Sequence, residues 1–405
     1  MKKELELYIH IPFCVKKCDY CDFLSFPASE ATQEEYTKAL IQEIRYYGTQ
    51  MTDYEVVTIY FGGGTPSWLA TEWMLEILDV IGDCFTIRRD AEVTMECNPG
   101  TVTYDKLKEY YRNGINRLSI GLQSTENSEL ELLGRIHTYE QFLKTYEMAR
   151  NAGFANINID LMSGIPHQNL ELFAKSLLRV IRLQPEHISA YSLIIEEGTP
   201  FYSRYKFDVV MQHAGLKTEH LPSEDETFRM MKATQQLLEK HGYKRYEISN
   251  YAKKGYESRH NIGYWERAEY LGMGLGAASL MDETRFTNTK DIHTYMKNAA
   301  EIKEQMFINE EDQSRSVFGC NLHMEANKLT RHEAMEEYMF LGLRKIDGIS
   351  REEFQRQFGT PIDGVYGQVI HKLRQEGLLE QKGGRIYLTD RGLDVSNYAM
   401  AQFLQ

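Results

Sequence analysis

The sequence predicts an α/β fold in which six short parallel strands alternate with helices and curl into a barrel or part of one. Short β-rich runs followed by longer helical patterns repeat from residue 5 to about 195, which is typical of a parallel sheet with helical crossovers. Polar and glycine-rich residues stand where these runs end, and the pattern changes past residue 285. The 405 residues suffice for one large and one smaller domain. We therefore expect domains over 1–285 and 286–405.

The strands are predicted from six β-rich runs that share Val, Ile, Leu and aromatic residues. In chain order they are LELYIHI (5–11), VVTIYF (56–61), AEVTMEC (91–97), RLSIGLQ (117–123), NINIDLM (156–162) and HISAYSLII (187–195). In the first run, apolar residues at positions 5, 7, 9 and 11 alternate with polar or aromatic ones. Because side chains alternate across a strand, one face should meet helices and the other should look into the barrel.

Chemistry-bearing residues gather at the ends of these strands. A cysteine cluster follows the first run, the glycine-rich stretch 62–66 follows the second, and Glu96, Gln123 and Asp160 lie late in the next three. Working residues of parallel barrels collect at the carboxyl ends of the strands. We therefore expect five strand ends to form one mouth.

The region past residue 285 reads as a polar helical stretch to about 325, followed by a helix-rich tail. In the tail, Ser350 and Glu353 match a capping box, and LLEQKGGRIYLT (378–389) predicts a hairpin that turns on Gly383-Gly384. Helices followed by such a hairpin indicate a winged-helix-like domain. Ten Lys and Arg against eleven Asp and Glu from 330 to 405 disfavour DNA binding. A packing or lid domain and a regulatory interaction module are the alternatives.

Composition limits the compartment and the partners. The N-terminus lacks the apolar segment of a signal peptide and no later stretch resembles a membrane span, so we expect a cytoplasmic protein. The formal net charge of −13 argues against nucleic acid as a partner. In a reducing compartment, clustered cysteines indicate metal binding or catalysis. The isolated Cys84, Cys97 and Cys320 are expected to be small core residues.

The stretch IPFCVKKCDYCDF (11–23) places Cys14, Cys18 and Cys21 at C-x3-C-x2-C spacing, so that three sulfurs of one short loop can converge. A structural zinc site takes a fourth Cys or His, and iron–sulfur clusters usually take four thiolates. Asp22 and Phe23 supply neither. A [4Fe-4S] cluster held by three cysteines would leave one iron open to a small molecule. Zinc is the alternative metal.

The C-x3-C-x2-C motif after the first strand, with GGG-T-P after the second, resembles the radical S-adenosylmethionine (SAM) superfamily over about 285 residues. This resemblance implies a partial (β/α)6 TIM-like barrel of the radical SAM type and a [4Fe-4S] cluster whose unique iron is chelated by the methionine part of SAM. Several phrases resemble the oxygen-independent coproporphyrinogen III oxidases and the HemW-type haem chaperones. They are YIHIPFC, FGGGTPS, ECNPG, RLSIGLQS, LGRIHT, NIDLMSGIPHQ, YSLIIEEGTP and SRHNIGYW.

The resemblance also implies site residues. A SAM site would be formed by Tyr8, Tyr20, Gly63, Gly64, Thr65 and Glu96. Positions that hold a second SAM-sized ligand in the oxidase correspond to Gln123, Arg135 and Asp160. Glycine allows close backbone approach to a ligand, and an ammonium group favours a carboxylate partner. The alternatives are an ordinary turn at the glycines, a solvated or capping role for Glu96, and a surface cation at Arg135.

Two departures separate this chain from the oxidase. The oxidase motif continues with a further cysteine where this chain has Phe23, and the oxidase carries an extension ahead of its first strand. A third feature, the H-N-x-x-Y-W motif, resembles the signature of the haem chaperones. It consists of His260, Asn261, Tyr264 and Trp265. A neutral imidazole can ligate haem iron, and Tyr and Trp offer flat faces to a porphyrin. A buried His-Asn pair beside a packed Trp is the structural alternative.

The resemblance therefore implies a haem chaperone that binds haem, a [4Fe-4S] cluster and SAM and delivers haem to apo-haemoproteins. The alternative function is oxidative decarboxylation of coproporphyrinogen III by radical SAM chemistry. The expected partners are recipient apo-haemoproteins, an electron donor if SAM is cleaved, and a membrane surface reached through recipients. The glycine-rich stretch YLGMGLGAAS (270–279) is expected to be scaffold, since no phosphate-binding lysine accompanies it.

Overall fold

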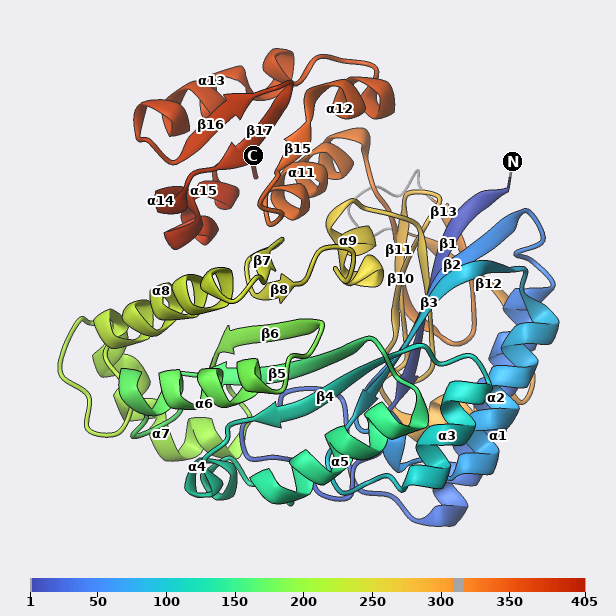
Figure 1. Cartoon of the computed structure of the whole chain (residues 1–405). Coiled ribbons are helices and arrows are strands. Elements are labelled where there is room, and N and C mark those ends of the chain that lie inside the picture. The colour runs from blue at the N-terminus through green and yellow to red at the C-terminus, as the bar shows by residue number, and fades with distance from the viewer. Residues whose placement is uncertain (1, 309–315, 405) are drawn as a thin grey trace.

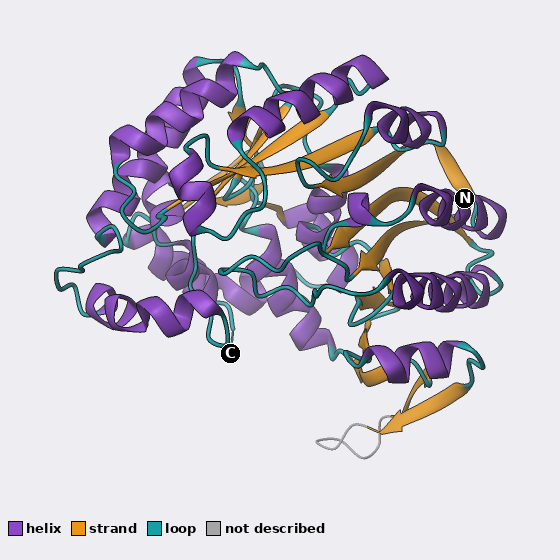
Figure 2. Ribbon diagram, turned by 90° about the horizontal axis from the view of Figure 1, so that it is seen from below, coloured by secondary structure: helices purple, strands orange, loops and turns teal. Residues whose placement is uncertain are grey.

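The computed structural model describes residues 2–308 and 316–404. In this part of the chain, twelve strands form one sheet in the order β14-β11-β10-β9-β1-β2-β3-β4-β5-β6-β8-β7. Strands β1 to β6 are parallel to one another, whereas β6 pairs antiparallel with β8. Figure 2 shows helices around the outside of the curved sheet. The predicted partial (β/α)6 barrel is confirmed.

The six parallel strands lie close to the predicted runs. They are β1 (Lys3–Ile11), β2 (Tyr54–Gly63), β3 (Ile87–Cys97), β4 (Arg117–Gln123), β5 (Ile157–Ser163) and β6 (His187–Ser192). The crossover segments contain α1 (Glu30–Gly48), η1 (Pro66–Trp68), α2 (Thr71–Cys84), α3 (Tyr104–Arg112), α4 (Asn127–Leu132), α5 (Tyr139–Ala152) and α6 (Leu170–Arg182). The sheet continues after α7 (Pro200–His213) and α8 (Glu224–Lys240) with the short strands β7 (Lys244–Arg245) and β8 (Asn250–Ala252).

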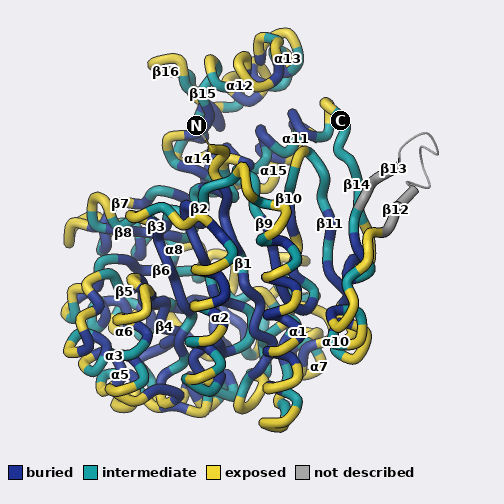
Figure 3. The backbone as a smooth tube through the Cα atoms, turned by 90° about the vertical axis from the view of Figure 1, so that its right-hand side faces the viewer, coloured by how far each residue is buried: buried dark blue, intermediate teal, exposed yellow. Residues whose placement is uncertain are grey.

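The alternation predicted for β1 explains how the barrel packs. The four aliphatic residues at positions 5, 7, 9 and 11 are fully buried in the core shared with α1. The other face of the strand carries Glu6, Tyr8 and His10, which point into the barrel. Figure 3 shows the buried strands at the centre and exposed positions along the outer helices. Helix starts follow from local sequence, because the Ser29 side chain accepts the Thr32 N–H at the start of α1.

The expectation of a polar helical stretch from 285 to about 325 is wrong. This region contains β11 (Thr284–Asn288), α10 (Ile292–Ala299), β12 (Glu304–Ile308), β13 (Ser316–Cys320) and β14 (His323–Lys328), while 309–315 lie outside the described residues. Together with β9 (Tyr270–Met273) and β10 (Ala278–Met281), strands β11 and β14 extend the sheet beyond β1. Strand β9 pairs with β1, β10 with β9, β11 with β10 and β14 with β11, so backbone pairing with the preceding strand outweighs the polar composition of these segments.

The tail forms the predicted winged-helix-like unit, with its own apolar core that starts at Ala334. Its elements are α11 (Arg331–Gly342), β15 (Ile349–Ser350), α12 (Arg351–Phe358), α13 (Ile362–Gln375), β16 (Leu379–Lys382), β17 (Arg385–Leu388), α14 (Asp390–Asp394) and α15 (Ser396–Ala401). The hairpin turns on Gly383 and Gly384, whose φ angles of 60° and 77° suit glycine. Ser350 caps α12 by accepting the N–H of Glu353.

The division into domains stays a proposal, and the strand order favours a boundary near residue 329 over one at 285, since β11 and β14 belong to the barrel sheet. The tail packs through α11 against α9 (Arg259–Trp265) on the side of the barrel shown at the top of Figure 1. The Glu337 carboxylate pairs with Arg267 at 2.9 Å, and Lys345 pairs with Glu266 at 2.5 Å. No helix of the described residues is long and apolar enough to cross a membrane.

Candidate functional site

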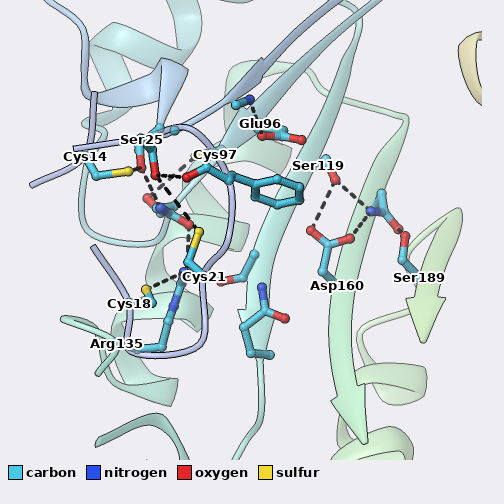
Figure 4. A pocket seen from close by; sticks show the side chains of 18 of the residues that line it. Cys14, Cys18, Cys21, Ser25, Glu96, Cys97, Ser119, Arg135, Asp160 and Ser189 are labelled. Atoms are coloured by element: carbon cyan, nitrogen blue, oxygen red, sulfur yellow. Dashed lines mark hydrogen bonds between the residues drawn. The ribbon is translucent and has the colours of Figure 1, made fainter. Parts of the chain in front are cut away.

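A cavity of about 250 Å³, here called the mouth cavity, opens where the parallel strands end. It brings together most of the residues predicted from the sequence: Cys14, Cys18, Tyr20, Cys21, Gly63, Gly64, Thr65, Glu96, Gln123, Arg135, Asp160 and Asn261. Tyr8, His260, Tyr264 and Trp265 do not line it. Figure 4 shows the three thiols on one side of the cavity and Asp160 with Ser119 and Ser189 on the other.

The cysteine loop is closed at its base by the strand that precedes it. The N–H of Phe26 donates to the carbonyl of Pro12 at 2.9 Å, and the N–H of Cys14 donates to the carbonyl of Phe26 at 3.1 Å. The ring of His10 bonds the carbonyl of Leu24 through Nε2 at 2.9 Å. Both ends of the loop formed by residues 14 to 25 are therefore held at the end of β1. This anchoring holds the three thiols beside the cavity.

Each thiol has a polar neighbour on the protein side. Thr65 Oγ1 donates to Cys14 Sγ at 3.4 Å, and Arg135 Nη1 donates to Cys18 Sγ at 3.6 Å. Asn98 connects these donors, because its Nδ2 donates to Thr65 Oγ1 and its Oδ1 accepts from Arg135 Nη2, both at 2.7 Å. Arg135 therefore lies against the cysteine loop and is not a surface cation.

The donor set suits an iron–sulfur cluster. Thiolates are the usual ligands of such clusters. Burial raises the pKa of the thiols of Cys14 and Cys21, so a bound metal would have to displace their protons. Among the described residues, no three His, Cys, Asp or Glu groups converge closely enough to hold a single metal ion. Ligands of a multi-iron cluster need not converge on one point, since each cysteine binds a different iron.

The glycine-rich turn after β2 is tight because it packs against β1. Gly63 has a φ of 108°, and a Cβ there would lie 2.4 Å from Cε1 of His10. A Cβ on Gly64 would lie 2.8 Å from the backbone nitrogen of Phe13. Close packing within the protein thus already requires glycine, beyond the ligand approach expected from the sequence. The N–H of Gly63 donates to Glu96 Oε2 at 3.2 Å.

Glu96 lines the cavity, and the pKa of its carboxyl group is raised. Burial, together with the negative charge of Asp160, raises the pKa of Glu96 to about 7. The hydroxyl of Tyr60 and the N–H of Gly63 both donate to it, at 3.0 and 3.2 Å. An ammonium group placed beside this carboxylate would restore its charged form. The amino group of SAM supplies such a cation, so the side chain fits the predicted role.

The far wall carries further charged and amide groups. Asp160 accepts from Asn158 Nδ2 at 2.7 Å and from Ser119 Oγ at 3.3 Å, and burial raises its pKa. Gln123 Oε1 accepts from the hydroxyl of Tyr191 at 2.8 Å. Arg117 lines the cavity, and its Nε has no hydrogen-bond partner within the described residues. A wall with both carboxylates and a guanidinium group suits a zwitterionic ligand such as the amino-acid part of SAM.

Sequence reasoning missed Tyr60, Asn98, Arg117, Ser119 and Asn158. Alternation was the available signal, because Arg117 and Ser119 share the face of β4 that ends at Gln123, and Asn158 shares a face of β5 with Asp160. Asn98 stood within the quoted phrase ECNPG.

Tyr8 lies one layer away from the mouth cavity. Its hydroxyl bonds His10 Nδ1 at 3.0 Å, and its ring stacks on that of Tyr60 with centroids 6.3 Å apart. Tyr60 occupies the wall that the sequence assigned to Tyr8. The predicted contact of Tyr8 with SAM stays a prediction, and in this structure it is Tyr60, stacked on Tyr8, that lines the cavity.

The H-N-x-x-Y-W motif forms α9, which closes the barrel below the mouth cavity. His260 is 1% exposed, with Nδ1 bonded to Thr58 Oγ1 at 2.7 Å and Nε2 bonded to the hydroxyl of Tyr264 at 3.0 Å. Burial, with the charge of Arg117, lowers the pKa of His260 to about 3. Its role as a haem ligand stays a prediction, and ligation would require loss of one of these hydrogen bonds. Trp265 stacks under the guanidinium of Arg344 at 4.4 Å.

Comparison with known proteins agrees with this geometry. The chain matches the Radical SAM superfamily model over residues 8–180 and the HemN C-terminal domain model over residues 329–395. The E. coli coproporphyrinogen III oxidase HemN, described as a radical SAM enzyme, superposes with a TM-score of 0.82 at 23% identity, covering 99% of this chain and 90% of that chain. At this identity, the likeness shows a shared fold.

Relatives by sequence are more specific. The protein named "Heme chaperone HemW" of Bacillus subtilis (strain 168) is 35% identical over 98% of both chains. The protein of the same name from Lactococcus lactis is 34% identical over 100% of this chain and 98% of its own length. The Escherichia coli protein of that name is 40% identical over 67% of this chain and 69% of its own. The chain therefore belongs to the radical SAM superfamily and, within it, to the HemW family.

Proposed function

We propose that this chain is a haem chaperone that holds a [4Fe-4S] cluster and SAM in the mouth cavity, binds haem, and delivers it to apo-haemoproteins. The observation that carries the cluster assignment is the gathering of Cys14, Cys18 and Cys21 around one cavity. The haem assignment rests on the near full-length similarity to proteins named heme chaperones.

The residues of the cavity have distinct tasks in this proposal. The three cysteines would hold the cluster. The iron without a protein ligand would offer a coordination position, and the reduced cluster would supply an electron. Thr65 and Arg135 keep donating to the ligand sulfurs, which limits the negative charge of the thiolates. Glu96 orients SAM through its amino group, and Arg117 offers an unused N–H to an anionic group.

Phe23 separates the proposed function from the oxidase alternative. It stands where the oxidase motif has a further cysteine, it is 70% exposed, and it lines the mouth cavity. Lys17 Nζ donates to its carbonyl at 2.8 Å, which fixes the loop around it. An exposed aromatic ring at this rim offers a surface to an apolar ligand but no thiolate.

The proposed partners follow from this function. They are haem, recipient apo-haemoproteins, an electron donor if SAM is cleaved, and a membrane surface reached through recipients. The alternative function would use the same SAM-facing side chains of the mouth cavity. The cytoplasmic location stays a prediction.

Anaerobically reconstituted protein should be incubated with SAM, a reductant, and either haemin or coproporphyrinogen III. We expect a saturable shift of the haemin Soret band and no decarboxylated porphyrinogen over many turnovers. Haem transfer to an apo-haemoprotein should accelerate with acceptor concentration, since transfer by spontaneous dissociation would proceed at a constant rate. Decarboxylated product formed with proportional consumption of SAM would establish the oxidase instead.

A further inference from the structure

One side chain beside the cysteine loop, Asn98, joins two of the groups that donate to the thiols. Asn98 directly follows β3 and lies between Thr65 and Arg135. Thr65 donates to Cys14 Sγ at 3.4 Å, and Arg135 donates to Cys18 Sγ at 3.6 Å. Figure 4 shows the side chain of Arg135 extending toward Cys18. One amide group therefore contacts the donors of two of the three thiols.

The chemistry of its partners fixes which way the Asn98 amide points. A guanidinium group can only donate, so the atom that faces Arg135 Nη2 at 2.7 Å must be the amide oxygen. The amide nitrogen then donates to Thr65 Oγ1, also at 2.7 Å. Because the Thr65 hydroxyl accepts this hydrogen bond, its own hydrogen is free to point at Cys14 Sγ. Asn98 thus sets the direction of the hydrogen bonds to both sulfurs.

Backbone hydrogen bonds hold this arrangement in place. The N–H of Asn98 donates to Ser67 Oγ at 3.2 Å, and the carbonyl of Asn98 accepts the hydroxyl of Thr101 at 2.7 Å. On the other side, Arg135 Nη2 also donates to the carbonyl of Gly121, on β4, at 2.6 Å. The amide and the guanidinium group are therefore both anchored to the ends of strands, and neither depends on a ligand for its position.

Arg135 brings a positive charge that no carboxylate neutralises. Its hydrogen-bond partners are the thiol of Cys18, the amide of Asn98 and a backbone carbonyl, and it forms no ion pair with the described residues. The other cations of the cysteine loop, Lys16 and Lys17, are exposed, so solvent screens their charges. Arg135 is less exposed than these lysines. Its charge therefore acts on the thiols more strongly than theirs does.

We propose that Arg135 and Asn98 together set the reduction potential of the cluster. Arg135 supplies the positive charge, and Asn98 is the positioning residue that directs Thr65 and Arg135 to their sulfurs. The inference rests on the proposed cluster at the three cysteines. Reduction adds one electron from an external reductant to the cluster and moves no proton, so the negative charge of the core and its thiolates increases. Hydrogen bonds and a positive charge at the sulfurs stabilise this reduced form and raise the potential.

This task is separate from the ligand contact that the resemblance implies for Arg135. Both terminal nitrogens of its guanidinium group are bonded inside the protein, whereas Nε is buried and has no partner in the described part of the chain. A ligand that uses Nε leaves the hydrogen bond to Cys18 intact. The reduction potential of the SAM-free protein therefore reports the contact with the cluster alone.

The test measures the reduction potential of the reconstituted, SAM-free cluster by anaerobic redox titration followed by electron paramagnetic resonance. Arg135→Gln removes the charge and should lower the potential by about 59 mV or more, a tenfold change in the equilibrium constant of a one-electron reduction. Asn98→Asp keeps the shape of the side chain, but its carboxylate would pair with Arg135 and accept a hydrogen bond from Thr65. The Thr65 hydrogen would then leave Cys14, so this variant should also lower the potential.

Two further variants separate this effect from a general effect of mutation. Arg204→Gln removes an exposed cation that pairs with Asp19 of the same loop at 2.9 Å. It should leave the potential unchanged, because Arg204 forms no hydrogen bond with a thiol in the described residues and solvent screens its charge. Asn98→Ala removes the amide without adding a charge, so it should lower the potential less than Asn98→Asp does. The iron content of each protein is measured alongside.

The outcomes distinguish this inference from the function on which it rests. A parent protein that assembles no cluster contradicts the proposed function itself. If the parent holds a cluster and its potential is the same in Arg135→Gln and Asn98→Asp, the inference is overturned. Weaker SAM binding by these variants at an unchanged potential would restrict both residues to the ligand. If Arg135→Gln holds no iron, the comparison of Asn98→Asp with Asn98→Ala and the parent decides by the same criterion.

Discussion

Thr58 and Tyr60 of β2 belong to two polar regions of the barrel, which differ in whether their side chains line a cavity. Tyr60 faces the mouth cavity, which Glu96 and Arg117 also line. Thr58 faces α9, where its hydroxyl bonds His260. We call α9 with its contacts on β1, β2 and β3 the plug. The mouth cavity leaves room for a ligand beside its hydrogen-bonded side chains. The side chains of the plug pack directly against one another, and of their buried polar atoms within the described residues only Glu6 Oε2 and Trp265 Nε1 lack hydrogen-bond partners.

The packing of the plug reinforces this difference. A Cβ on Gly263 would lie 2.0 Å from the carboxylate of Glu6, so α9 approaches β1 as closely as glycine permits. The backbone N–H groups of Arg259 and His260 donate to Glu92 at 3.1 and 3.2 Å. These contacts hold α9 firmly against the barrel. A signature can also mark a place where the chain must close its barrel.

The largest expected effect concerns iron at the mouth cavity. Combining Cys18→Ala with Cys21→Ala should reduce the iron of anaerobically reconstituted protein from about four per chain to almost none. The circular dichroism spectrum should not change, because both side chains lie at the cavity edge. Cys84→Ala, on α2, should keep all of the iron. Iron retained by the double variant would refute the cluster assignment.

The next effect concerns the stability of the plug. His260→Ala should lower the free energy of unfolding by about 2–4 kcal/mol, because it opens a cavity and removes the hydrogen bonds that His260 makes with the hydroxyls of Thr58 and Tyr264. Urea unfolding of the parent and the variant measures the change, with the exposed His293→Ala as control. A fully stable His260→Ala that has lost its haem spectrum would instead make the plug a ligand site.

A smaller effect concerns SAM affinity. Glu96→Gln keeps the shape of the side chain but removes a charge-assisted hydrogen bond to the SAM amino group, worth about 1.5–3 kcal/mol. Calorimetry on cluster-loaded protein should show SAM binding weakened by about ten- to a hundredfold, with unchanged iron content. Equal affinity in both proteins would restrict Glu96 to holding the turn at Gly63.

The smallest effect is a pH dependence of the same contact. Because the pKa of Glu96 is raised to about 7, its carboxylate becomes protonated as the pH falls below that value. SAM affinity should therefore decrease about tenfold from pH 7.5 to pH 6. Above about pH 8 it should decrease again, since an α-amino group loses its proton there. Glu96→Gln should abolish the acidic limb only, and an acidic limb that persists in this variant would point to another titrating group.

Much of the barrel could be predicted because its signals are local. Strand β1 alternates with a period of two and α1 begins at a Ser cap, so neighbouring residues alone determine both. The spacing of Cys14, Cys18 and Cys21 lies within one loop of eight residues. The turn at Gly383-Gly384 likewise needed only the dipeptide and its flanking strands.

Other features depend on contacts between distant parts of the chain. Strands β11 and β14 look polar in isolation and become strands because the edge of the sheet beyond β1 has to be paired. The contact of Arg135 with Cys18 joins residues 117 positions apart. The burial of His260 depends on Thr58, which lies 202 positions earlier in the chain. Residue type predicted the available chemistry at Cys18, Arg135 and His260 but not their partners.

The sequence by itself determined the six parallel strands, the thiol cluster and the family, because periodicity and motif spacing act over a few residues. Only the tertiary structure decided which polar side chains face open space and which face one another. The closure of the barrel places Glu96 and Arg117 toward the mouth cavity and His260 toward the plug. Exposure is a property of the assembled layers, so no local pattern encodes it.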